Sequence, residues 1–306
     1  MTMSDQGPPP HQRNTADDDP LIGSSTGGFC DWLEKVRQVA ARSWRSSLAI
    51  SLVGIALPFV IVSMTSEAMG VRRYLPPDVG DIRGLVDRLP DAVLGLLVTL
   101  AALAAAVYIA AGTWAAGLWA IVEEGTTGRR VSLIAAFRFG FTRARSLWPW
   151  LLAIGAAAEI GLLCCLLPGA YVIYACSLFG FVAVFERGAN PVLRSVALTH
   201  RRIGTAAGRV LAALLPYAVY SMIYTLVVNT TFRAMSGLGA LAGTTTEPGV
   251  AMLRGALNLI QVALLGMTVA VMMIALFVTY AQLRADEGPI TAEDLRSGLS
   301  AAGSNA

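Results

Sequence analysis

Long apolar segments alternate with polar loops along this chain, and the pattern predicts a polytopic helical membrane protein. An α-helix needs about 17–25 predominantly apolar residues to cross ~30 Å of hydrocarbon. Six segments approach or reach that length: Leu48–Met64, Ala92–Trp114, Leu147–Leu167, Ala170–Phe185, Val210–Val228 and Leu257–Tyr280. The second stays apolar as far as Val122, which leaves its end open. We therefore expect an all-α fold, a polytopic membrane helix bundle with six transmembrane helices.

Composition divides the chain into three parts. The chain is 55% hydrophobic and only 14% charged, whereas soluble domains carry about 25% charged residues. Residues 1–28 are rich in Pro, Asp, Ser and Gly, which predicts a disordered cytoplasmic tail. Residues 29–288 form the expected membrane domain, and residues 289–306 a short cytoplasmic C-terminal tail. In that tail Thr291 and Asp294 match a weak capping box, which predicts a short helix.

The distribution of basic residues predicts the topology, because lysine and arginine are retained on the cytoplasmic side during insertion. They concentrate before the first span, between spans two and three, and between spans four and five: Lys35, Arg37, Arg42, Arg45, Arg129, Arg130, Arg138, Arg143, Arg145, Arg187, Arg194, Arg201, Arg202 and Arg209. Tryptophan favours the membrane–water boundary, and all six fall at the same predicted face: Trp32, Trp44, Trp114, Trp119, Trp148 and Trp150. Both termini are therefore expected in the cytoplasm. Arginine supplies every basic residue except Lys35, as in GC-rich bacterial genomes, so we expect the bacterial cytoplasmic membrane.

Three cytoplasmic stretches are amphipathic at helical spacing and predict about three interfacial helices, each leading into a span. The first carries Trp32, Val36 and Val39 on one face. The second carries Leu133, Ile134, Phe137 and Phe141 opposite its arginines. The third opens with Asn190-Pro191, a helix cap followed by proline at the first helical position. We infer three modules, each made of an interfacial helix and two spans.

Glu159 is the one carboxylate or basic group well inside a predicted span, where a charge is costly. It is therefore the candidate intramembrane functional residue, able to carry a proton or hold a cation. The alternative is a structural role, in which a protonated Glu159 makes one interhelical hydrogen bond. No intramembrane Lys, Arg or His stands ready to pair with it, which weakens the proton-relay interpretation.

The cytoplasmic arginines are candidate contacts for anionic lipid headgroups or phosphates, since each adds about 1 kcal/mol near the surface. The candidates are Arg129, Arg130, Arg143, Arg145, Arg194, Arg201 and Arg202. The alternative is that these residues serve topology alone, which every polytopic protein requires.

The residues that carry chemistry elsewhere are sparse in this chain. The cysteines Cys30, Cys164, Cys165 and Cys176 form no CxxC pair, and the two histidines lie far apart in the sequence. We expect no catalytic residue, no cofactor-binding residue and no metal ligand, and hence no enzyme activity. An intramembrane lipid enzyme would need an acid–base pair or a nucleophile, and Glu159 alone does not supply one. We also expect no nucleic-acid partner.

One stretch carries a family likeness. Leu166-Leu167-Pro168-Gly169 leads into a short span that ends in Phe185-Glu186-Arg187-Gly188, and Arg194-Ser195 and Leu198-Thr199-His200-Arg201-Arg202 follow. This stretch resembles a bacterial integral-membrane family related to the membrane domain fused to some glycerophosphodiester phosphodiesterases. The family-motif positions are Pro168, Gly169, Glu186, Arg194 and Ser195. The C-terminal part of this region, Tyr280 to Gly288, resembles a shortened form of the family's C-terminal segment, with Gln282 where Asp is usual and without a second Arg.

The resemblance spans about residues 92–288 and implies a six-helix membrane domain of uncharacterised role. It does not imply phosphodiesterase activity, which resides in a separate soluble domain with acidic and His metal ligands. We expect a scaffold, accessory or lipid-interacting membrane protein, with membrane lipids, including anionic ones, and a membrane protein as its partners. The alternative function is a small-solute or lipid transporter or channel that uses Glu159.

Overall fold

The computed structural model describes residues 19, 21–22, 27–58, 60, 62, 82–186, 188–228, 230, 248–288 and 290–300. Within these ranges the regular structure is entirely helical, so the fold is all-α as predicted. The helices are α1 (Phe29–Ser51), α3 (Ile82–Thr127), α4 (Leu133–Cys164), α5 (Leu166–Ala175), α6 (Phe179–Phe185), α7 (Pro191–Arg201), α8 (Ile203–Ile223), α10 (Pro248–Ala285) and α11 (Ala292–Ser300). Two π-helical turns, η1 (Leu52–Ala56) and η3 (Tyr224–Val228), continue α1 and α8.

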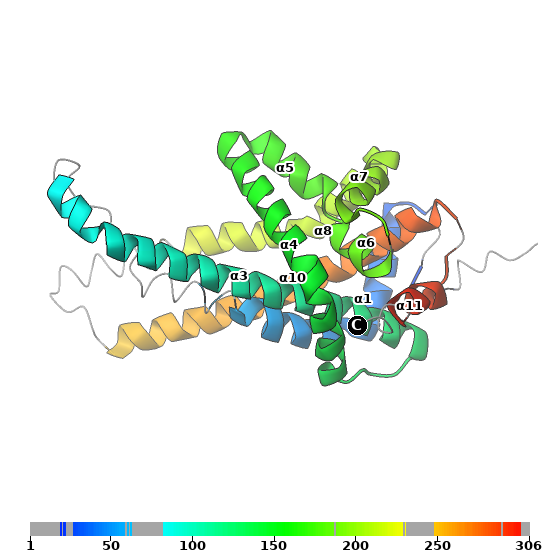
Figure 1. Ribbon diagram of the computed structural model, residues 1–306. Coiled ribbons are helices and arrows are strands. Elements are labelled where there is room, and N and C mark those ends of the chain that lie inside the picture. The colour runs from blue at the N-terminus through cyan, green and yellow to red at the C-terminus, as the bar shows by residue number, and fades with distance from the viewer. Residues whose placement is uncertain are drawn as a thin grey trace, which may run out of the picture.

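The long helices set the shape of the molecule. In Figure 1, α3, α8 and α10 extend toward one end, whereas the short helices α6, α7 and α11 gather at the opposite end. The α4–α5 hairpin projects away from the long helices. Arginine-bearing segments therefore lie together at the end of the molecule that holds the short helices. Arg194 of α7 and Arg296 of α11 both form ion pairs there.

Helix α10 is the centre of the core. In its most apolar stretch 67% of the residues are buried, against 6% for α3. Phe277, Val278 and Ala281 are fully enclosed and belong to the largest cluster of buried apolar side chains. The indole Nε1 of Trp32 in α1 donates a hydrogen bond of 3.1 Å to Thr279 Oγ1 in α10. Trp32 is thus buried inside the protein, so its ring packs in the core and is not exposed on the surface.

Among the described residues, five helical segments are long and apolar enough to span a membrane: Val93–Thr127, Leu133–Cys164, Leu166–Phe185, Ile203–Leu226 and Leu259–Ala285. They correspond to the second to sixth predicted spans. The first predicted span, Leu48–Met64, lies partly outside the described residues, which run continuously only to Pro58. The protein is therefore a helical protein with the composition of a multi-pass membrane protein.

Helix boundaries differ from the predictions at two places. Helix α3 runs unbroken for 46 residues, or about 69 Å at 1.5 Å per residue, so it is longer than the bilayer is thick. The predicted spans Leu147–Leu167 and Ala170–Phe185 leave a break at Pro168-Gly169, but the break lies instead at Cys165, whose extended backbone (φ −167°, ψ 140°) separates α4 from α5. Pro168 sits in the first turn of α5, where its missing N–H leaves no hydrogen bond unmade.

Two of the three predicted interfacial helices are not separate elements. Residues 29–51 form one helix that continues into η1, and residues 133–164 form one helix through the arginine-rich stretch and the span. Only α7 is a separate helix, because the chain breaks at Arg202 (φ −136°, ψ 64°) before α8 begins. The buried face of α1, including Trp32 and Val39, packs in the protein core and not on a lipid surface.

The N-terminal boundary also shifts. Most of residues 1–28 lie outside the described ranges, but Leu21 and Ile22 are exposed by only 1% and 0%. Their backbone N–H groups donate to Asp19 Oδ1, and Lys35 Nζ donates to the Asp19 carbonyl at 2.5 Å. Asp19, Leu21 and Ile22 therefore belong to the packed part of the protein and not to a disordered tail, as was predicted for residues 1–28.

The closest approach between α3 and α4 depends on Gly140. A Cβ atom there would overlap the carbonyl oxygen of Gly112 and lie 2.9 Å from the backbone nitrogen of Ala116. Both are backbone groups, so a side chain at Gly140 would push the two helices apart. Gly155, on the same helix, differs in that a Cβ atom added to it would meet nothing within 4 Å.

We expect Gly140→Ala to lower the free energy of unfolding by about 1–3 kcal/mol, as overpacking does in cores. Gly155→Ala is the matched control and should leave it unchanged or raise it by roughly 0.5–1 kcal/mol, since alanine favours the helix. The measurement is the thermal unfolding midpoint of each purified variant in detergent. Equal midpoints for the two variants would contradict the close approach.

Candidate functional site

The polar centre of the molecule begins at a break in an apolar segment. Helices α5 and α6 form one candidate span, but residues Cys176 to Leu178 make a turn between them. The Ser195 hydroxyl of α7 donates to the Ala175 carbonyl at 2.8 Å and accepts from the Leu178 N–H at 3.2 Å. The family-motif serine, fully buried, thus satisfies backbone groups that the break leaves without helical partners.

Helix α7 is positioned by the cap that its sequence predicts. Asn190 Oδ1 accepts hydrogen bonds from the N–H groups of Val192 and Leu193, and Pro191 occupies the first helical position. Three residues later, Arg194 reaches the end of α6 and the turn that follows α10. The Asn190-Pro191 prediction is confirmed.

Arg194 joins two carboxylates that lie far apart in the sequence. Its Nε donates to Glu186 Oε2 at 2.7 Å, and its Nη1 donates to Glu287 Oε1 at 2.9 Å. Nη2 also donates to Glu287 Oε2, so the guanidinium grips that carboxylate with two bonds. Such bidentate pairs are the stronger kind of ion pair.

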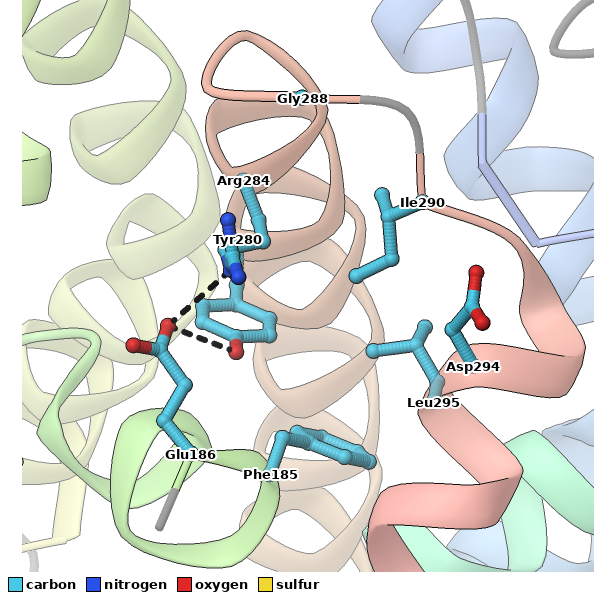
Figure 2. A pocket seen from close by; sticks show the side chains of 8 residues that line it. All are labelled: Phe185, Glu186, Tyr280, Arg284, Gly288, Ile290, Asp294 and Leu295. Carbon is cyan, nitrogen blue, oxygen red and sulfur yellow. Dashed lines mark hydrogen bonds and ion pairs between the residues drawn. The ribbon is translucent and has the colours of Figure 1, made fainter. Parts of the chain in front are cut away.

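Helix α10 supplies the remaining members of this group. The Tyr280 hydroxyl donates to Glu186 Oε1 at 3.1 Å, and Arg284 Nε lies 3.5 Å from the same oxygen, as the dashed lines in Figure 2 indicate. Arg284 also pairs with Glu287 at 3.1 Å. We refer to Glu186, Arg194, Tyr280, Arg284 and Glu287 as the Arg194 cluster. It joins α6, α7 and α10 at the end of the molecule where the short helices gather.

Helix α11 closes this end. Thr291 and Asp294 form the predicted capping box, with hydrogen bonds of 2.8 Å from Thr291 N to Asp294 Oδ2 and 3.2 Å from Asp294 N to Thr291 Oγ1. Asp19 Oδ2 accepts from the N–H of Ala292 at 2.9 Å, so the N-terminal segment also caps α11. The predicted short helix is confirmed.

A cavity of about 360 Å³ lies between the Arg194 cluster and α11. Figure 2 shows the side chains that line it: Phe185, Glu186, Tyr280, Arg284, Gly288, Ile290, Asp294 and Leu295. Both oxygens of Glu186 already accept hydrogen bonds from cluster members, and Asp294 is engaged with Thr291. The polar groups that line this cavity therefore bond to other residues of the protein, and these bonds join the helices.

The electrostatics of the cluster follow from its geometry. Burial raises the pKa of Glu287, but the hydrogen bond from Arg194 and the charges of Arg194, Arg284 and Arg201 outweigh it, so the pKa lies below its ordinary value of 4.5. The hydrogen bond to Glu287 is the main reason that the pKa of Arg194 is raised. Both groups stay charged near neutral pH.

The candidate lipid-binding arginines separate into two sets. Arg194, Arg201 and Arg202 pair with carboxylates, Arg201 with Glu287 at 3.2 Å and Arg202 with Asp286 at 3.3 Å. Arg143 lies over the ring of Phe139, with its Cζ 5.8 Å from the ring centroid.

The other set stays open to solvent or headgroups. The candidates Arg129 and Arg130 in the turn before α4 and Arg145 on α4 have exposed side chains, and so does Arg138 on α4, which was not among the candidates. Within the described part of the chain none of these four forms an ion pair. We call Arg129, Arg130, Arg138 and Arg145 the arginine rim.

Glu159 lies on the exposed surface of α4, on the hairpin that projects from the long helices. It stands near the end of the helix, because α4 stops at Cys164. The structure does not bring it together with the candidate arginines or with the Arg194 cluster.

Several polar contacts could not be read from the sequence. Glu123 at the end of α3 pairs with Arg296 of α11 through hydrogen bonds of 3.0 and 2.9 Å. The buried Glu124 beside it accepts from Ser46 Oγ at 2.6 Å and from the Val131 N–H at 3.1 Å. The one local signal was a pair of adjacent acidic residues at the end of a long apolar segment, which fits poorly with a simple lipid-facing helix.

We expect Arg194→Lys to lower the free energy of unfolding by about 1–3 kcal/mol, because an ammonium cannot hold two carboxylates with the same geometry. The matched control is Arg37→Lys in the surface pair with Glu34, where 73% of the arginine side chain is exposed. Such exposed pairs contribute little to stability, because solvent screens their charges. Thermal unfolding in detergent compares the two, and equal losses would show that the Arg194 cluster does not fasten the helices.

Acid should weaken the Arg194 cluster. Since the pKa of folded Glu287 lies below 4.5, the stabilisation is present above about pH 4.5 and is lost as the pH falls through the lowered value. We expect the thermal unfolding midpoint of the wild type to decrease as the pH is lowered below about 4.5. Glu287→Gln should be less stable at neutral pH and show a shallower decline toward acid. A variant whose acid profile parallels the wild type would assign the decline to other groups.

Comparison of the chain with known protein families, with curated proteins and with solved structures gives no match. The likeness to the membrane domain of some glycerophosphodiester phosphodiesterases therefore stays a prediction. The chain is a helical protein with several candidate membrane spans. The ion pairs of the Arg194 cluster join α6, α7 and α10 at one end of it.

Proposed function

We propose that this chain is a multi-pass protein of the bacterial cytoplasmic membrane, with both termini in the cytoplasm, that acts as a lipid-interacting scaffold or accessory protein. Five candidate spans support the membrane location. The gathering of the arginine-bearing segments with α11 and α7 at one end supports the orientation, since basic residues stay on the cytoplasmic side. In this proposal the protein carries out no catalysis of its own, and its partners are anionic lipids and a further membrane protein.

The arginine rim carries this proposal. The four guanidinium groups of the arginine rim are exposed, whereas Arg194, Arg201 and Arg202 pair with carboxylates. Apolar side chains lie beside them on α4, where Ile134 is 81% exposed and Leu133 and Phe141 are also exposed. Exposed arginines next to exposed apolar groups suit a surface that lies at the boundary between headgroups and hydrocarbon.

The transport alternative receives less support from the geometry. A carboxylate in a transport path is expected to face the bundle interior or a water-filled cavity. The side chain of Glu159 is exposed on the outer face of α4 instead. We therefore favour the lipid-interacting role.

Native mass spectrometry of the protein, gently extracted from its own membrane, tests the proposal. We expect anionic lipid to be enriched over zwitterionic lipid in the wild type. Replacing all four rim arginines with Gln should abolish the enrichment, because each contributes about 1 kcal/mol of attraction to an anionic surface.

The zwitterionic lipid retained by the same samples is the internal control and should not change. A wild type that retains no excess of anionic lipid would contradict the lipid role. A protein that copurifies in stoichiometric amount would identify the partner that the scaffold role requires.

A further inference from the structure

A second cavity, of about 490 Å³, lies between the C-terminal end of α3 and the turn that leads into α4. Its lining residues are Trp119, Glu123, Thr127, Arg129, Arg130 and Val131. Gly128 begins the turn with φ +67°, a left-handed conformation that favours glycine. The Val131 N–H then bonds to the buried Glu124, which fixes the turn against α3. The backbone that carries Arg129 and Arg130 is therefore fixed against α3.

The charge of this cavity is positive. Arg129 and Arg130 are exposed and have no ion-pair partner within the described part of the chain. Glu123 is the one acidic member of the lining, and Arg296 neutralises it with two hydrogen bonds of 2.9 and 3.0 Å. An anion that enters therefore meets two exposed guanidinium groups and a carboxylate that is already engaged.

The start of α4 adds to this positive field. Ser132 is its N-cap residue, but the serine side chain makes no capping hydrogen bond. The first N–H groups of a helix have no partner within the helix, and the helix dipole places partial positive charge there. Beside two arginines, this helix start is an additional source of donors for phosphate oxygens.

Exposed apolar residues follow the lining residue Val131 closely in the sequence, at the start of α4. Leu133 and Ile134 follow the turn directly, and both are exposed. The ring of Trp119 lies in the wall and stacks on Phe139, with centroids 6.0 Å apart. A free anion gains nothing from exposed leucine and isoleucine, whereas a lipid places its acyl chains beside its phosphate.

We infer that this cavity binds the phosphate group of an anionic lipid, and that helix α11 sets the charge of the cavity through the Arg296–Glu123 pair. This rests on the lipid-interacting role proposed above and gives it a defined site. When Arg296 is in place, Glu123 does not repel the phosphate. When α11 leaves, the unpaired carboxylate opposes binding, so docking of the C-terminal helix and lipid binding favour each other.

The first experiment locates the site with the full chain in detergent. The probe is dioctanoyl phosphatidylglycerol, titrated by native mass spectrometry, with dioctanoyl phosphatidylcholine as the neutral comparison. We expect Arg129→Gln/Arg130→Gln to weaken phosphatidylglycerol binding about 25-fold, from roughly fivefold per arginine. The comparison variant, Arg138→Gln/Arg145→Gln, removes the same charge from the part of the arginine rim that lies outside the cavity lining, and it should weaken binding severalfold less than the cavity variant does.

Two outcomes of this experiment overturn the inference. Equal weakening by the two double variants would leave the lipid role intact but remove the cavity as its site. Inorganic phosphate that binds as tightly as phosphatidylglycerol and displaces it would mean that the cavity takes free phosphate. A wild type that binds neither anionic probe above the neutral lipid would overturn the proposed function itself.

The second experiment tests the role of α11 with three variants. Arg296→Gln should weaken phosphatidylglycerol binding about fivefold, because it leaves Glu123 charged and unpaired. Glu123→Gln should bind at least as tightly as the wild type, and Arg296→Gln/Glu123→Gln should regain wild-type binding. If Glu123→Gln weakens binding as much as Arg296→Gln, the pair acts only by holding α11 and the charge mechanism is wrong.

Discussion

Inside hydrocarbon a backbone N–H or C=O group has no water to bond, so each must find a partner within the protein. The turn between α5 and α6 interrupts one candidate span and leaves backbone groups without helical partners, and Ser195 satisfies two of them with hydrogen bonds. That contact fixes α7 against the broken span, which in turn places Arg194 between Glu186 and Glu287. One buried hydroxyl therefore determines where the ion pairs form, and through them how α6, α7 and α10 meet.

The two proposed roles of arginine in this protein differ in their electrostatics. In the Arg194 cluster every guanidinium has a carboxylate partner, so the cluster stabilises the fold and offers little net attraction to an anion. The rim arginines have no such partner in the described residues and keep their charge available. A lipid-binding surface requires the second kind. Counting arginines in the sequence does not separate the two kinds, because pairing depends on which helices meet.

Local patterns predicted local structure well. The Asn190-Pro191 cap and the Thr291–Asp294 box depend on residues within one helical turn, and both form as expected. The Glu123–Arg296 contact joins positions 173 residues apart, and no periodicity reports such a pair. The burial of Leu21 and Ile22 was not predicted for a related reason. Two apolar residues in a polar segment give no local signal of burial, because the core against which they pack is formed by residues far away in the sequence. Amphipathic stretches merged with their spans because nothing in α1 or α4 stops the helix.

Helix α3 has a mechanical consequence through its length. From Pro90 to Thr127 the helix continues without a further proline, so a tilt at one end of this part is accompanied by a displacement at the other. Its C-terminal end carries Glu123 and Glu124, which hold α11 and the turn with Arg129 and Arg130. Any force that tilts this helix therefore also moves the wall of the cavity that Arg129 and Arg130 line.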